Sequence, residues 1–197
     1  MIGGFLRSSI LMVSERLKLL ALLNVLFFGC ILVSGFVASI FVSPIVNPQI
    51  LEPVLLNGLG DNWLLVFLWI FAFNLSVGAF MVVTLPGMAL FPLSVVPLLF
   101  RAFLWGLIVY AIPVESFLSA FVVLLLEGEA YVFAAAGGIT TGVSWVKPRW
   151  IHVDVADSRR RAFTTGLHNC LKFYVFVVLL LFLGALAETI GIALTAG

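Results

Sequence analysis

Five long apolar stretches, separated by more polar segments, make up most of the chain. They lie at about residues 19–42, 63–84, 86–112, 116–146 and 171–193. A helix of about 20 apolar residues crosses the hydrocarbon core of a bilayer, and each stretch is long enough to do so. The pattern therefore predicts an all-α fold, a polytopic bundle of five transmembrane helices in a single domain, residues 1–197.

The segment before the first stretch, about residues 3–18, mixes apolar and charged positions. Its apolar residues are Phe5, Leu6, Ile10, Leu11, Val13 and Leu17, and its charged residues are Arg7, Glu15, Arg16 and Lys18. This mixture is typical of a short helix that lies in the membrane interface. The apolar run that follows is too long for the core of a signal peptide, so we expect a retained anchor.

Basic residues predict the orientation, because cytoplasmic loops carry an excess of Lys and Arg. The N-terminal segment and the loop at about 147–170 are basic, whereas the segment at 43–62 has no Lys or Arg. With five spans, this places the N-terminus and the 147–170 loop in the cytoplasm and the C-terminus outside. Arg159, Arg160 and Arg161 in that loop are candidates for contact with anionic lipid headgroups.

The composition agrees with a membrane protein whose first partner is the lipid bilayer. Hydrophobic residues make up 63% and charged residues 10% of the 197, whereas soluble domains are about half apolar and a quarter charged. A net charge of +1 gives no indication of a nucleic-acid partner. The sequence lacks the motifs of a P-loop, a dinucleotide site, HExxH, CxxC or GxSxG, and His152 and His168 have no metal-ligand spacing, so we predict no cofactor, metal or catalytic set.

Charged residues inside the apolar stretches are the candidate site. Leaving aside Lys172 at a stretch boundary, they are Arg101, Glu127, Glu129 and Glu188. Each costs roughly 3 kcal/mol at the bilayer centre, so such residues normally face the bundle interior and find partners. A tight turn near Pro113 and Glu115 makes the third and fourth spans an antiparallel hairpin. Arg101 and Glu127 then reach nearly the same depth, which predicts an ion pair.

Three further residues have predicted places around this pair. Tyr131 lies one helical turn from Glu127 and can donate a hydrogen bond to it. Glu129 is about 200° from Glu127 on a regular helix, so either it faces another helix or the helix breaks at Gly128. Glu188 falls in the same outer half of the membrane. A shared polar cluster is either an ion or proton path or a structural network, and no periodic row of polar residues lines a pore, which favours the network.

Prolines and small residues predict local features of two spans. Pro86, Pro92 and Pro97 fall in the first half of the third span, which predicts that it is kinked or partly re-entrant. The small residues of the fourth span form a surface that another helix can approach closely. That surface comprises Ala134, Ala135, Ala136, Gly137, Gly138 and Gly142.

Three segments resemble the stage II sporulation protein M family of five-span membrane proteins, from about Asn62 to the end. They are FNLSVGAFMVV, which contains Asn74, LLEGEAYVFAAAGGITTG, and the ending RRRAFTTGLHNCLKFYVFVVLLLFLGALAETIGIALT. The resemblance matches Glu127, Ala130 and Gly138 in the second segment and Ala185 with Glu188 in the third, and it adds Asn74 to the candidate cluster. The chain departs from the family where it has RAFLWG in place of an Asn-Gly and Leu-Glu-Gly in place of a Pro-His-Gly.

The resemblance implies a non-enzymatic subunit or scaffold in a bacterial or archaeal plasma membrane, which assembles with other membrane proteins or with itself. The alternative is a channel or transporter for an ion, proton or small solute that uses the Arg and Glu cluster. A third hypothesis is an intramembrane protease with a glutamate base. It is the least favoured, because such a base usually needs a polar partner and both histidines lie in the predicted cytoplasmic loop.

Overall fold

The computed structural model describes residues 2–41, 62–112, 117–147 and 159–195, and these residues are almost entirely helical. Among the described residues, five helices are long and apolar enough to cross a membrane. They are Leu17–Phe41, Trp63–Ala89, Phe91–Tyr110, Phe117–Val146 and Arg159–Ala193. The predicted all-α, five-span fold is confirmed, and the chain is a multi-pass membrane protein. Which side each end faces stays a prediction.

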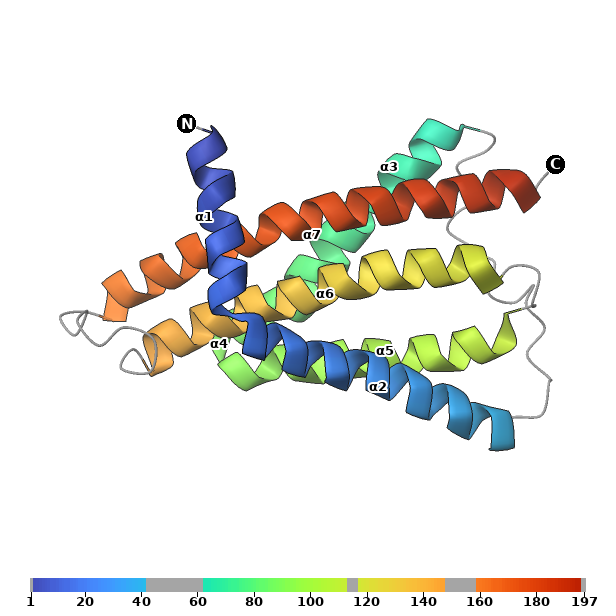
Figure 1. The fold of residues 1–197 in the computed structure, drawn as a ribbon, viewed down its shortest axis with the longest axis horizontal. Coiled ribbons are helices and arrows are strands. Elements are labelled where there is room, and N and C mark those ends of the chain that lie inside the picture. The colour runs from blue at the N-terminus through green and yellow to red at the C-terminus, as the bar shows by residue number, and fades with distance from the viewer. Residues whose placement is uncertain (1, 42–61, 113–116, 148–158, 196–197) are drawn as a thin grey trace.

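The elements run along the chain in a simple order (Figure 1). They are α1 (Ile2–Glu15), α2 (Leu17–Phe41), α3 (Trp63–Phe73), the π-helix η2 (Asn74–Thr84), α4 (Leu85–Ala89), the 3₁₀-helix η3 (Phe91–Ser94), α5 (Val95–Ala111), α6 (Phe117–Val146) and α7 (Arg159–Thr195). The segments α3, η2 and α4 follow one another without a break and form the second span. The predicted turn near Pro113 and Glu115, and the loops at 43–61 and 148–158, lie outside the described residues.

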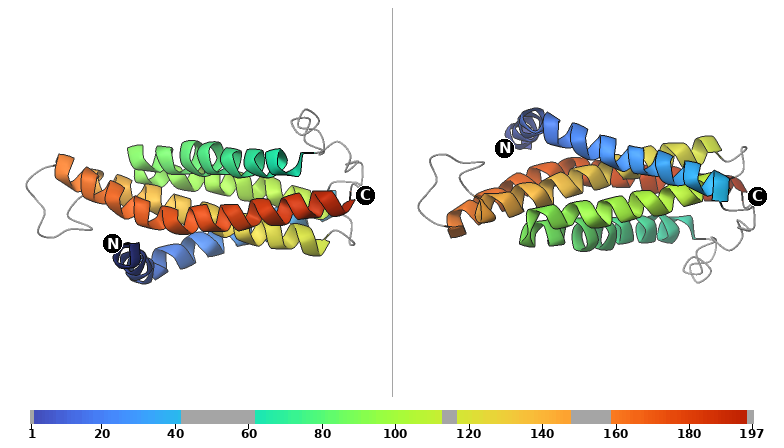
Figure 2. Two further views of the ribbon diagram at one scale, coloured as in Figure 1. Left: turned by 90° about the horizontal axis from the view of Figure 1, so that it is seen from above. Right: turned by 90° about the horizontal axis from the view of Figure 1, so that it is seen from below.

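Helix α1 crosses the direction of the bundle, and Figures 1 and 2 show it turned away from the long helices. A turn at Arg16 separates it from α2. Ser9 and Met12 are buried, and the Phe5 ring meets the His168 ring edge to face on α7. Leu6, Ile10 and Leu11 are exposed. A separate helix with an exposed apolar side is what the interfacial prediction requires, although its position in a membrane stays a prediction.

Helix α6 lies at the centre of the bundle, where α7 packs along it and α2, η2, α4, η3 and α5 also contact it (Figures 1 and 2). Its small residues bring these neighbours close, since a Cβ at Gly138 would lie 2.7 Å from the Thr84 carbonyl oxygen and one at Gly137 would lie 2.9 Å from Cys170 Sγ. The surface predicted from Ala134–Ala136 and the glycines is therefore filled by this chain's own helices. Close backbone approach of this kind is how helices associate in lipid.

The last helix begins earlier than the predicted fifth span. Residues 159–170 were expected to be loop, but α7 starts at Arg159 and is continuous. The reason is a buried stripe that begins in this polar segment with Ala162, Gly166 and Cys170 and continues through Phe173, Val177 and Leu181. Hydropathy hides the start of this stripe, because most of the other positions in the segment are charged or polar. Gly166 lies against Thr141 and Ser144 of α6, and Thr141 donates to its carbonyl at 3.1 Å.

The boundary between the second and third spans also differs from the prediction. It lies at Leu90, which is extended, rather than at 84–86. Pro86 and Pro92 are the second residues of α4 and η3, and Pro97 lies in the first turn of α5. The predicted third span, 86–112, is therefore broken at Leu90 and is not one straight helix, as its prolines indicated, whereas re-entrance into a membrane stays a prediction.

The carbonyls near this boundary are covered by side chains, as an irregular backbone in a membrane requires. Trp145 Nε1 of α6 donates to the Met88 carbonyl at 2.7 Å, and Ser94 Oγ donates to the Val83 carbonyl at 2.8 Å. Thr84 Oγ1 bonds the Ala134 carbonyl at 3.0 Å. The reversal of the chain therefore depends on its contact with α6.

We predict that Gly142→Ala destabilises the fold by about 1–3 kcal/mol, the usual range for overpacking. The added Cβ would lie 2.8 Å from the Phe91 backbone nitrogen, and backbone atoms at this reversal cannot give way easily. The measurement is thermal unfolding in detergent. Unfolding is monitored by the reaction of a fluorogenic dye with the Cys170 thiol, which is buried in the fold.

The control is Gly29→Ala on α2, where nothing lies within 4 Å of an added Cβ. That variant should be neutral or stabilised by up to about 1 kcal/mol, because Ala favours helix more than Gly does. Equal melting temperatures for the two variants would contradict the close-packing account.

Candidate functional site

Asn74 joins three helices through its side-chain amide. Its Nδ2 donates to Glu127 Oε1 of α6 at 2.8 Å. Its Oδ1 accepts from Arg101 Nη2 of α5 at 3.3 Å and from Tyr131 Oη of α6 at 3.0 Å, so Tyr131 donates to Asn74 and not to Glu127 as predicted. The Asn74 amide therefore uses both its donor and its acceptor to bond charged and hydroxyl groups, which need hydrogen-bond partners in an apolar interior. Residues Asn74, Arg101, Glu127 and Tyr131 are called the polar cluster below.

The Arg101 guanidinium is held by charge and by aromatic rings. Its Nη2 lies 4.0 Å from Glu127 Oε2, and its carbon lies 3.9 Å from the centre of the Tyr131 ring and 5.3 Å from that of Trp105. A cation over an aromatic face is attracted to the ring, and more strongly away from water. The Glu127 side chain is only 4% exposed and that of Arg101 26%. Glu127 is therefore the more deeply buried member of the ion pair.

The local backbone makes room for this arrangement. Gly78 of η2 faces the cluster, where an added Cβ would lie 2.8 Å from Tyr131 Oη and 3.3 Å from Arg101 Nη1. The π-helix begins at Asn74 itself, next to the regular α3. A π-turn is rare and frequently marks a functional site. Here the change of helix type coincides with the residue that bridges the cluster.

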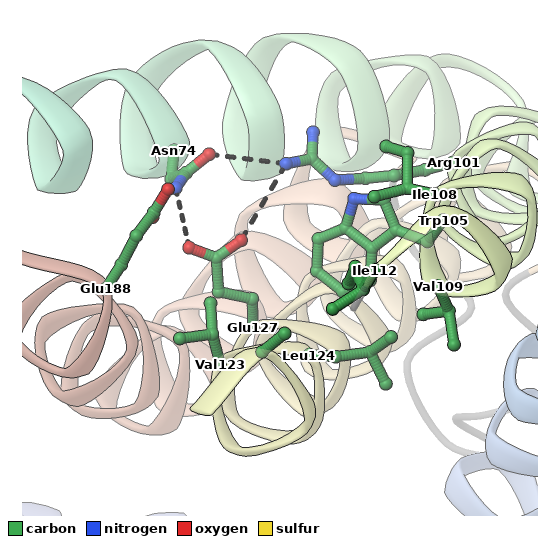
Figure 3. A pocket seen from close by; sticks show the side chains of 11 residues that line it. Asn74, Arg101, Trp105, Ile108, Val109, Ile112, Val123, Leu124, Glu127 and Glu188 are labelled. Carbon is green, nitrogen blue, oxygen red and sulfur yellow. Dashed lines mark hydrogen bonds and ion pairs between the residues drawn. The ribbon is translucent and has the colours of Figure 1, made fainter. Parts of the chain in front are cut away.

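A cavity of about 380 Å³ opens beside the cluster (Figure 3). Its polar lining consists of Asn74, Arg101, Trp105, Glu127 and Glu188, and its aliphatic lining consists of Ile108, Val109, Ile112, Ala120, Val123 and Leu124. The aliphatic residues come from the end of α5 and the start of α6. The cavity is therefore amphipathic, with charged groups on one side and hydrocarbon on the other.

The two remaining glutamates lie in different places. Glu188 of α7 lines the cavity, and Figure 3 shows its side chain reaching toward Asn74. Among the described residues, no hydrogen bond or ion pair holds it. Of the two alternatives predicted for Glu129, the structure shows the first: α6 is continuous through Gly128, and Glu129 faces α2, where it accepts from Asn24 at 3.4 Å, so it lies apart from the polar cluster. The 200° separation from Glu127 accounts for this.

Several site residues were missed from the sequence, and two of them left a signal. Trp105 is one turn from Arg101, and Asn24 is the one amide side chain in the first apolar stretch. No signal in the sequence pointed to Gly78, because its role depends on the contact between η2 and α6. The predicted headgroup residues Arg159, Arg160 and Arg161 begin α7, and their side chains are exposed. The described residues contain no cluster of three or more potential metal ligands.

Comparisons with protein-family models, with curated proteins and with solved structures found no match for this chain. The resemblance to the stage II sporulation protein M family therefore stays a prediction.

We predict that Arg101→Met destabilises the protein by about 2 kcal/mol, because it leaves the Glu127 carboxylate buried beside Asn74 without its cation. The loss of unfolding free energy in the double variant Arg101→Met/Glu127→Met should be smaller than the summed losses of the two single variants. The difference should be at least about 1 kcal/mol, since the two groups interact directly. Unfolding free energies in detergent give the coupling.

The matched control is Glu129→Met, two residues along the same helix. Glu129 makes one long hydrogen bond to the described residues, so Glu129→Met should lower the free energy of unfolding by less than about 1 kcal/mol. This loss and that of Arg101→Met should be additive. Strict additivity of Arg101→Met with Glu127→Met would show that the polar cluster does not act as a unit.

Proposed function

We propose that this protein is a non-enzymatic integral membrane subunit that assembles with another membrane protein or with a second copy of itself. The observation that carries the proposal is a groove on the outer surface of α2 and α5. Its volume is about 400 Å³, and its lining is Val25, Leu26, Gly29, Cys30, Val33, Ser34, Val37, Leu99 and Phe103. It is called the α2–α5 groove below.

Small residues give this groove the shape that a further helix would use. Gly29, Cys30 and Ser34 lie in it on α2, between larger apolar side chains. Gly29 leaves open space, with nothing within 4 Å of an added Cβ, so internal packing does not explain it. Small residues on a lipid-facing surface let a second helix approach closely, which is the main source of association in a bilayer.

The polar cluster fits the same interpretation. Its four members bond mainly to one another and fix the second, third and fourth spans relative to each other. A buried network of this kind sets helix register, with no chemistry required of it. Placement in a bacterial or archaeal plasma membrane, with the N-terminus and the exposed arginines of α7 in the cytoplasm, is part of the proposal and rests on the charge pattern and the family resemblance.

The test is native mass spectrometry of the protein extracted from its own membranes in a mild detergent. We expect a particle heavier than one chain, and Gly29→Leu, which fills the α2–α5 groove, should reduce it to one chain. The subunits in the heavier particle identify the partner as another protein or as a second copy.

The control is Gly4→Leu in α1, the same change at another helical glycine with open space around it. It should leave the particle intact. A lone chain in the unmodified sample, or association that Gly29→Leu does not alter, would reject the proposal.

A second candidate function is passage of a small solute, which the cavity beside the polar cluster favours. Charged groups inside a membrane commonly line substrate or ion paths. The test is flux of monovalent cations and protons into liposomes that contain the purified protein. We expect flux that falls at least tenfold in Ala120→Phe, which fills the cavity, and not in Glu129→Gln, which lies outside it. Flux equal to that of empty liposomes would remove this candidate.

A further inference from the structure

We propose that the cavity beside the polar cluster binds a small monovalent organic cation that has an apolar body. The site is formed by four helices, with Asn74 from η2, Arg101 from α5, Glu127 from α6 and Glu188 from α7 on its polar side. Its volume of about 380 Å³ falls in the usual range for small-molecule sites, about 300–1,000 Å³.

The charge of the lining selects the sign of the ligand. Arg101 is paired with Glu127, and the two are joined again through Asn74. Glu188 is a second carboxylate on the same cavity, and no hydrogen bond or ion pair from the described residues engages it. One guanidinium and two carboxyl groups face the space, so the lining carries one excess negative charge when both carboxyls are ionised. In surroundings of low dielectric, an excess charge strongly favours a partner of opposite sign.

The shape and chemistry of the remaining lining select the type of cation. Opposite the charged groups, the wall is aliphatic, from Ile108, Val109 and Ile112 on α5 and from Ala120, Val123 and Leu124 on α6. A bare Ca²⁺ or Mg²⁺ needs six or more oxygen ligands, which a half-hydrocarbon wall does not offer. An ammonium group beside Glu188 with an alkyl or aryl body against α5 and α6 satisfies both sides at once.

This inference specifies the ligand class for the second candidate function, but it concerns binding and does not need transport. Binding is therefore measured at equilibrium in detergent, where no gradient exists. Binding without flux would reject the transport function and would still support the binding site. Loss of assembly after Gly29→Leu would test neither transport nor binding.

The experiment is calorimetric titration of the purified full chain with benzyltrimethylammonium, and with benzenesulfonate as an anion of similar size. We expect the cation to bind at least tenfold more tightly than the anion. Glu188→Gln should weaken binding of the cation at least tenfold, because it removes the excess charge and keeps the shape. Glu129→Gln, a carboxylate outside the cavity, should leave binding unchanged.

Ala120→Phe provides an independent check on location, since it fills the aliphatic part and should abolish binding while Glu188 is intact. Thermal unfolding of each variant separates loss of binding from loss of fold. The proposal is overturned if folded protein binds neither compound, if benzenesulfonate binds more tightly, or if Glu188→Gln binds the cation as well as the unmodified chain does.

Discussion

The close packing of other helices against the small residues of α6 is the constraint on which the rest of the structure depends. In a bilayer the hydrophobic effect does not drive helices together, so association rests on contact area and on polar bonds between helices. The glycines of α6 let the backbones of α4, η3 and α7 come within contact distance. The same contact allows the chain to reverse at Leu90 inside the bundle, because Trp145 of α6 covers a carbonyl that the break exposes.

The polar cluster is a consequence of this packing. α6 presents Glu127 and Tyr131 one turn apart on the side that faces η2 and α5. Arg101 then finds a carboxylate, an amide oxygen and two aromatic faces within reach, and this set offsets the cost of a guanidinium in an apolar environment. Asn74 is the link, because an amide is both donor and acceptor and joins an acid, a base and a hydroxyl without a net charge.

The sequence was informative where a single physical rule decides the outcome. Length and hydropathy are sufficient to find five spans, and equal rise per residue brings Arg101 and Glu127 to one depth. It was misleading where an element is polar but packed, as in residues 159–170, whose buried stripe is only Ala162, Gly166 and Cys170. The bridging role of Asn74 and the cavity depend on how α3 and η2 are rotated, and a helix that is apolar on every side carries no pattern that fixes its rotation.

A purely structural network accounts for the pair but not for Glu188. Arg101 and Glu127 compensate each other's charge and Asn74 bonds both, while the buried Nε of Arg101 has no hydrogen-bond partner among the described residues. A second carboxyl group on the same cavity adds a further desolvation cost and makes no hydrogen bond or ion pair to the described helices. A carboxyl group that is costly to place in a membrane and makes no hydrogen bond or ion pair to the described helices is what the proposed ligand of the cavity accounts for, and the aliphatic wall opposite it fits a molecule with a hydrocarbon surface.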